Sequence, residues 1–170
     1  MIVFLKPEEQ HQHTNGGGWV ANTAKVKDTA YVGPNALVFG NALVSGKALV
    51  FGNARVFGNA QVFGNAQVFG NALVSGKARV SGDAQVSGDA RVSGDARVFG
   101  DAWSTSPLYI QGTRHSITNS AFGKLSIGCI TLTFAEWKKQ YKKIGKEQGY
   151  TPAQIKEYGL LIVCAVKVAK

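Results

Sequence analysis

Valine occupies every sixth position from Val20 to Val98 without interruption. Alanine keeps the same six-residue step from Ala24 to Ala102, so that each of these valines from position 26 onward follows an alanine by two positions. In most units a glycine followed by Asn, Asp or Lys separates one valine from the next alanine. Repetition at a short, fixed period is the signature of a solenoid.

The repeating unit predicts its own geometry. Residues two apart in an extended strand face the same side, so Ala and Val point together and the residue between them points away. Glycine adopts positive φ without steric cost, and Asn and Asp tolerate this region better than other residues, so each Gly-Asx pair predicts a corner. Three such corners close a triangular coil of eighteen residues with Val and Ala inside. The repeats predict between four and five coils, ended by Trp103, with Ser104 at the place of the next valine.

The pairs Val32 with Ala36 and Val38 with Ala42 resemble the hexapeptide repeat of the left-handed parallel β-helix, in which an aliphatic and a small residue line the prism. This resemblance implies the left-handed sense of the coil, which sequence physics does not supply. The whole chain also resembles hexapeptide-repeat proteins of bacteriophage and bacterial genomes. That wider resemblance depends on 110–115, 127–129 and Trp137.

The outward positions of the repeats divide into two zones. The polar zone extends from Ser75 to Arg97 and carries Ser, Arg and Gln. The apolar zone comprises Leu37, Phe39, Leu43, Leu49, Phe51, Phe57, Phe63, Phe69 and Leu73. Because contiguous apolar surface usually marks an interface, we expect the apolar zone to pack between subunits. Similarity to other prisms of this kind implies a homotrimer. The alternative is that the Phe rings merely stack along the corners of one chain.

We expect a mostly β fold with four segments. Residues 1–18 form an N-terminal strand and a mobile, Gly-rich loop, and 19–103 form the three-sided β-helix. Residues 104–132 are expected to contain strands at 107–111, 115–118 and 124–129, a small β cap over the open end of the prism. Residues 133–170 are expected to form two short helices. A capping box predicts the start of each helix, Thr133 with Glu136 for the first and Thr151 with Gln154 for the second.

Charge and composition limit the partners. The net charge is +9, and 124–170 carries nine lysines against three glutamates, which favours small anionic ligands. No known nucleic-acid motif accompanies the lysines, so we do not expect a nucleic-acid partner. No apolar stretch is long enough for a signal peptide or a membrane span, and two cysteines do not suggest a disulfide framework. These features predict a protein of the cytoplasm, in a bacterium or a phage-infected host, without a membrane partner.

The cap holds the densest group of chemically capable side chains. An Arg offers bidentate contacts to an anion, and hydroxyls and amides set its orientation. We therefore predict a homo-oligomeric protein without enzymatic activity, cofactor or metal, which binds an anionic, nucleotide-like ligand at the cap; by analogy, a phage protein of this kind could sequester a nucleotide signal. The predicted ligand-binding residues are Gln111, Thr113, Arg114, His115, Ser116, Thr118, Cys129 and Thr131.

Two alternatives stay open at this point. Proteins with this prism are often acyltransferases that use acyl-CoA and a histidine, and here His115 is the candidate base, or the partner of Cys129 as an activated thiolate. The uninterrupted coils contain no histidine, which weakens this reading. The second alternative is a structural or assembly protein whose apolar faces are its function.

Overall fold

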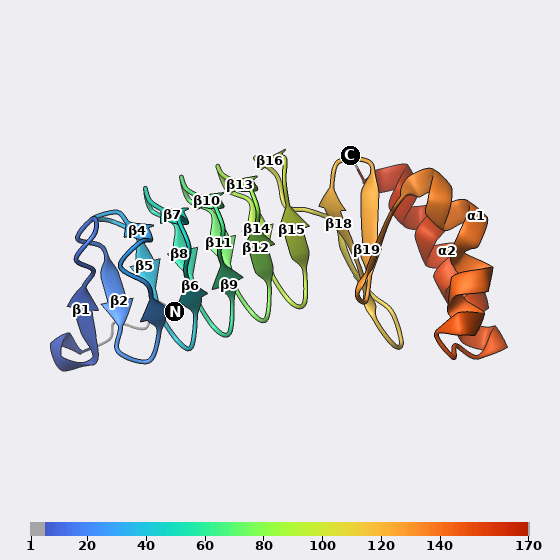
Figure 1. The fold of residues 1–170 in the computed structure, drawn as a ribbon, viewed down its shortest axis with the longest axis horizontal. Coiled ribbons are helices and arrows are strands. Elements are labelled where there is room, and N and C mark those ends of the chain that lie inside the picture. Colours follow the sequence, from blue (N-terminus) through green and yellow to red (C-terminus); the bar gives the residue numbers. More distant parts are fainter. Residues whose placement is uncertain (1–5, 170) are drawn as a thin grey trace. The chain divides into compact units, whose positions relative to one another are not determined.

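The computed structural model describes residues 6–169, so the strand expected at the N-terminus lies outside the described residues except for its last position. The described chain forms two compact units. One contains the repeats (residues 6–95 and 99–106), and the other contains 96–98 with 107–169. Figure 1 labels most of the elements of both.

The repeats form a three-sided parallel β-solenoid, as expected. Its three sheets run in the orders β2-β5-β8-β11-β14, β3-β6-β9-β12-β15 and β4-β7-β10-β13-β16, so strands three apart in the chain are neighbours and five turns result. The handedness of the coil stays a prediction. The strands are β2 (Trp19–Ala21), β3 (Lys25–Val26), β4 (Tyr31–Val32), β5 (Leu37–Val38), β6 (Leu43–Val44), β7 (Leu49–Val50), β8 (Arg55–Val56), β9 (Gln61–Val62), β10 (Gln67–Val68), β11 (Leu73–Val74), β12 (Arg79–Ser81), β13 (Gln85–Val86), β14 (Arg91–Val92), β15 (Arg97–Phe99) and β16 (Ala102–Trp103).

The inner column is made of the repeated valines and alanines. Val56, like its equivalents along the column, is 0% exposed. Val26 is the exception and is half-buried, because β3 is the last strand of its sheet and has no turn beyond it. Backbone bonds join each turn to the next, for example Leu37 N–H to the Ala54 carbonyl at 3.0 Å and Phe39 N–H to the Val56 carbonyl at 3.0 Å. The expected core is therefore confirmed, apart from Val26 at this end and the exposed Ala102 at the other.

The corners need glycine for two reasons. Gly40 has φ of +66°, in the left-handed region that favours glycine. A Cβ at Gly40 would also lie only 3.0 Å from the backbone nitrogen of Gly58 in the next turn. The corners thus stack backbone on backbone, and a side chain at this position would separate the coils.

The last turn departs from the expected pattern. Val68 pairs with Val86, eighteen residues further on, whereas Val86 pairs with Trp103, only seventeen residues further on. Asp101 adopts φ of +54° at this corner, and the shift of one residue exchanges the faces of the strand. Trp103 is consequently 4% exposed and Ala102 is exposed, so Trp103 takes the inward place that the period assigns to Ser104.

Side chains on the solenoid corners form ladders along the stack. The rings of Phe39 and Phe57 are parallel with centroids 4.8 Å apart, and Phe51 and Phe69 stack in the same way at 5.0 Å. Asn65 donates a hydrogen bond to the Asp83 carboxylate in the next turn at 2.9 Å. The expected stacking of Phe rings is therefore present, and it leaves open whether the apolar zone also meets other subunits.

The N-terminal loop is held against the first coil, contrary to the expectation of a mobile loop. A 3-10 turn (Pro7–Glu9) leads into β1 (Gln10–Gln12), which pairs antiparallel with β2. Asn15 donates from its side chain to the carbonyl of Ala30 at 3.0 Å, and Gly18 N–H bonds the carbonyl of Val32 at 2.9 Å. These bonds satisfy backbone groups that the first turn would otherwise leave unpaired.

The second unit is a four-stranded antiparallel sheet with two helices. Its strands, in spatial order, are β17 (Tyr109–Gln111), β18 (Ser116–Ala121), β19 (Lys124–Ile127) and β20 (Ile130–Thr133). The sequence predicted three strands and placed Cys129 inside the third. In the structure β19 ends at Ile127, Gly128 and Cys129 form a tight turn with Gly128 at φ of +60°, and β20 is the strand that the prediction lacked.

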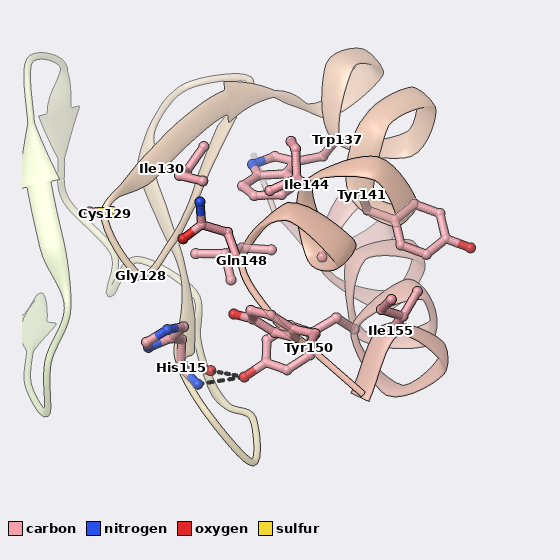
Figure 2. Close-up of a pocket in the computed structure, with 13 residues that line it drawn as sticks. His115, Gly128, Cys129, Ile130, Trp137, Tyr141, Ile144, Gln148, Tyr150 and Ile155 are labelled. Carbon is pink, nitrogen blue, oxygen red and sulfur yellow. Dashed lines mark hydrogen bonds between the residues drawn. The ribbon is translucent and has the colours of Figure 1, made fainter. Parts of the chain in front are cut away.

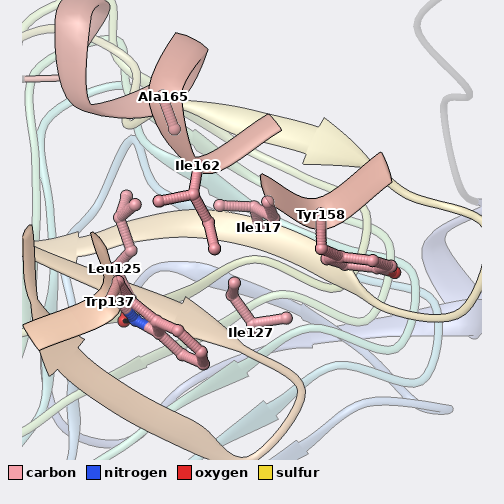
Figure 3. Packing of buried hydrophobic residues seen from close by; sticks show 7 residues of the cluster. All are labelled: Ile117, Leu125, Ile127, Trp137, Tyr158, Ile162 and Ala165. Carbon is pink, nitrogen blue, oxygen red and sulfur yellow. Dashed lines mark hydrogen bonds between the residues drawn. The ribbon is translucent and has the colours of Figure 1, made fainter. Parts of the chain in front are cut away.

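The helices α1 (Phe134–Glu147) and α2 (Pro152–Val168) begin at the two predicted capping boxes, which are both present. They cover one face of the sheet and bury Ile117, Leu125, Trp137, Tyr158 and Ile162 (Figure 3). The Trp137 indole donates to the Leu125 carbonyl at 2.8 Å, which fixes α1 on β19. Within residues 6–169, no helix has the length and apolar character to cross a membrane. That this unit caps the solenoid stays a prediction.

Candidate functional site

A pocket opens in the C-terminal unit between the β19–β20 turn and the two helices (Figure 2). Its volume is about 40 Å³. Two of the predicted site residues, His115 and Cys129, line it. The wall also includes Trp137 and Tyr150, so an apolar, largely aromatic cavity carries a histidine and a thiol.

The turn before β18 is built around the hydroxyl of Tyr158. This oxygen accepts the amide N–H of Arg114 at 3.1 Å and that of His115 at 2.5 Å, and it donates to the His115 carbonyl at 2.7 Å. A Cβ at Gly112 would lie 2.5 Å from the same hydroxyl. The sequence Gln-Gly-Thr-Arg-His therefore wraps a tyrosine of α2, which sets the backbone of His115.

The imidazole of His115 is confined by its neighbours. Its ring lies against Gly128, where an added Cβ would meet the imidazole at 3.2 Å. On another side the Tyr150 ring lies with its centroid 6.0 Å away, tilted by 52°. Because Gly128 also has positive φ, glycine is required here both for the turn and for the approach of the histidine. His115 is exposed, and its ring has these neighbours on two sides.

Arg114 lies beside Tyr150, which lines the pocket. Its guanidinium carbon is 4.8 Å from the centroid of the Tyr150 ring, and it donates to the Gly149 carbonyl at 2.9 Å. Arg114 is exposed, so its guanidinium can also reach an anion from solvent. Burial raises the pKa of Tyr150 above its ordinary value, and the positive charge of Arg114 opposes this rise. Tyr150 is therefore a neutral hydroxyl at neutral pH.

Three predicted site residues lie on the other face of the sheet. Ile117 packs under the helices, so Ser116 and Thr118, its neighbours in β18, point to the opposite side. Thr131 of β20 lies on that side too, with its hydroxyl 2.6 Å from Ser126, which in turn donates to Ser120 at 2.7 Å. Ser116, Thr118 and Thr131 therefore do not line the pocket, and Thr118 is only 2% exposed.

The remaining two predicted residues hold the turn together. Gln111 donates to the Gly112 carbonyl at 2.9 Å and accepts from the Tyr109 hydroxyl at 2.6 Å. Thr113 donates its amide and its hydroxyl to the Glu157 carboxylate, at 2.9 and 2.5 Å. The polar groups of Gln111 and Thr113 are therefore already bonded within the protein, and the structure gives them a positioning role.

The sequence prediction missed the site residues of α2 and of the segment before it. Gln148, Tyr150 and Tyr158 all line the pocket. Tyr158 belongs to α2, and Gln148 directly follows the end of α1. A signal was present for Tyr150, an aromatic residue in the short connection between two capped helices.

The structure defines a repeat β-solenoid protein with a small α+β unit at its C-terminus. Four segments of the repeats, 60–76, 66–82, 84–98 and 90–105, match the family model described as YdcK Beta solenoid repeat. Together they cover less than half of the chain, and none includes a residue of the pocket. Comparison with curated proteins gives no match, and comparison with solved structures gives none either. The resemblance to hexapeptide-repeat and phage proteins stays a prediction.

Proposed function

We propose that this protein binds a small anionic ligand without transforming it, at the pocket lined by His115 in the C-terminal unit. The observation that carries the proposal is the position of His115, whose ring lies beside Gly128 and Tyr150 and whose backbone is held by the Tyr158 hydroxyl. Arg114 supplies positive charge beside it. Because the backbone groups of His115 are already ordered, binding of a ligand loses little further conformational entropy there.

The charge of the surrounding unit supports an anionic ligand. Residues 124–170 carry a net charge of +6, from nine lysines and three glutamates. Each glutamate is already engaged within the protein: Glu136 with Thr133, Glu147 with Lys143 at 3.9 Å, and Glu157 with Thr113. A positive field of this kind raises the local concentration of anions and their rate of association.

The volume of the pocket refines the ligand class. Space of about 40 Å³ accepts about three groups of the size of a water molecule, which is far less than a whole nucleotide needs. A nucleotide-like signal therefore reaches the pocket only with one end group, and its remainder lies outside near Arg114. A small anion fits without this restriction.

Calorimetric titration tests the proposal. Inorganic phosphate, small carboxylates and a panel of mono-, di- and cyclic nucleotides are titrated into the wild-type protein, His115→Ala and Arg114→Gln. We expect at least one anion to release heat, with its affinity reduced at least tenfold in both variants. Gln85→Ala is the matched control, because Gln85 is an exposed residue of the solenoid. No heat from any anion, or equal affinity in all four proteins, contradicts the proposal.

One observation favours a second candidate function. His115 and Cys129 line the same pocket, and Cys129 is exposed. A histidine-activated thiolate for acyl transfer from acyl-CoA would need these two side chains within hydrogen-bond reach of each other. Incubation with a panel of acyl-CoA donors and mass spectrometry of the intact protein test it. An acyl adduct that Cys129→Ser or His115→Ala abolishes would establish the enzyme.

We also propose that the protein is a homo-oligomer, with a trimer as the first expectation, joined through the apolar zone of the solenoid. Trp19 and Leu43 support this, because they are large apolar side chains that are 39% and 38% exposed on the described chain. Subunit contact would remove this surface from water.

A further inference from the structure

The wall of the pocket combines a large apolar surface with a few polar groups. Ile127, Ile130, Ile144 and Ile155 contribute branched aliphatic surface to its wall, together with the Trp137 ring. The Trp137 N–H is already bonded to the Leu125 carbonyl, so it offers no donor to a ligand. The Tyr158 hydroxyl is likewise occupied by the backbone of Arg114 and His115. These parts of the wall therefore offer a ligand only carbon surface.

The polar groups of the wall include the His115 imidazole, the Gln148 amide, the Cys129 thiol and the hydroxyls of Tyr141 and Tyr150. His115, Gln148 and Cys129 are exposed, whereas Tyr141 and Tyr150 are half-buried. Arg114 adds a cation beside Tyr150. An anionic head is thus met where solvent reaches the site, and an apolar tail is met inside.

We propose that the ligand of this pocket is a short-chain monocarboxylate, with its alkyl tail against the isoleucines and its carboxylate at His115 and Gln148. This inference rests on the proposed function and specifies its ligand class. An aliphatic tail gains from every methylene that it removes from water, whereas a phosphate or a ribose gains nothing from aliphatic walls. The carboxylate head fits the positive charge of the unit.

The cavity volume sets the length of the tail. A methylene group occupies about as much space as a water molecule, so about 40 Å³ holds about three of them. The best ligand therefore carries three or four carbons beyond its carboxylate, as in butyrate and pentanoate. Longer tails extend into solvent and gain no further affinity.

A homologous series of carboxylates measures this directly. Acetate, propionate, butyrate, pentanoate, hexanoate and octanoate are titrated calorimetrically into the full-length protein, with 1-butanol as the uncharged comparator. We expect affinity to rise about three- to fourfold with each carbon. The rise should stop at four or five carbons in total, and 1-butanol should bind at least tenfold more weakly than butyrate.

A variant of the wall tests the position of the tail. Ile155 is half-buried and lines the pocket, so Ile155→Ala enlarges the pocket. The chain length at which affinity stops rising should then increase by one or two carbons. Leu160→Ala on the same helix is the control, because Leu160 is 66% exposed outside the pocket and its removal should leave the limit unchanged. Circular dichroism verifies that both variants are folded.

The outcomes separate this inference from the proposed function. Binding of phosphate or of a nucleotide that His115→Ala abolishes, with no dependence of carboxylate affinity on chain length, overturns the carboxylate inference and leaves the proposed function intact. Failure of every anion to bind contradicts both. A length limit that Ile155→Ala does not shift also overturns the inference, because the tail would then lie elsewhere.

Discussion

The hydroxyl of Tyr158 bonds both backbone groups of His115, accepting its N–H at 2.5 Å and donating to its carbonyl at 2.7 Å. His115 and Tyr158, more than forty residues apart in sequence, are joined by these bonds. They hold the backbone of His115 and so help to position its side chain. Removing one oxygen atom from Tyr158 should therefore disturb the site without changing His115 or Arg114.

Tyr158→Phe should reduce the free energy of unfolding by about 1 to 3 kcal/mol, because it leaves backbone groups of Arg114 and His115 without their partner. Urea denaturation measures the change. Tyr109→Phe is the matched control, since the Tyr109 hydroxyl bonds an exposed side chain and its loss should cost less than about 0.5 kcal/mol. Equal effects in the two variants would show that Tyr158 does not organise the turn.

Gly128→Ala should weaken ligand binding. Its new Cβ would meet the His115 ring at 3.2 Å, so the ring would have to shift by a few tenths of an ångström. Gly123→Ala separates this contact from backbone strain, because Gly123 has a similar φ of +71° but nothing within 4 Å of the added carbon. We expect both variants to lose about 1 kcal/mol of stability from strain and only Gly128→Ala to lose affinity. Loss of affinity in both would remove the specific role of Gly128.

Shortening a core valine to alanine should lower the free energy of unfolding more in the middle of the solenoid than at its end. Val56 is fully buried in the middle of the stack, so Val56→Ala should destabilise the protein by about 2 kcal/mol. Val26 occupies the equivalent place at the end of the stack and is half-buried, and Val26→Ala should cost clearly less. Thermal or urea denaturation of the pair measures the difference. A larger cost at Val26 would contradict the observed stacking.

The ionisation of Tyr150 should occur above the ordinary range for tyrosine, because burial raises its pKa. A group whose pKa is raised on folding stabilises the protein below the unfolded pKa of about 10, and this contribution is lost as the pH rises through the folded value. The ultraviolet titration of tyrosinate in the wild type, minus that of Tyr150→Phe, isolates this residue. A difference curve centred below pH 10 would contradict the prediction.

The apolar zone predicts the oligomeric state. Light scattering of the purified protein should give a mass of three chains, and Leu43→Asp should reduce it because Leu43 presents apolar surface on a solenoid face. Gln85→Asp introduces the same charge at an exposed outward position of the polar zone and should leave the mass unchanged. A wild-type mass of one chain would rule out the trimer.

The solenoid core could be predicted from the sequence because each of its contacts repeats. One Val and one Ala per six residues determine the inward column, and the corner glycine determines the bend. The last turn could not be predicted in the same way. Alanine keeps its period as far as Ala102, and only tertiary pairing reveals that Asp101 shortens the corner and turns Trp103 inward.

The site was predicted only in part. His115 and Cys129 do line one pocket, and the sequence paired them on chemical grounds alone. The alternation in β18 would have placed Thr118 on the face opposite Ile117, and this signal was not used. Tyr158 could not be assigned, because the packing of α2 on the sheet depends on contacts between residues far apart in sequence.

The behaviour of the three histidines under titration tests the central claim that small anions bind at His115. Imidazole resonances in a two-dimensional proton–carbon spectrum are assigned by His115→Ala, His11→Ala and His13→Ala, and phosphate, butyrate and a nucleotide are then added. His11 is the internal reference, because it bonds Asn22 in the solenoid. We predict a saturable shift of the His115 resonance while that of His11 stays fixed. A His115 resonance that no anion moves, or that moves only together with His11, would contradict binding at this pocket.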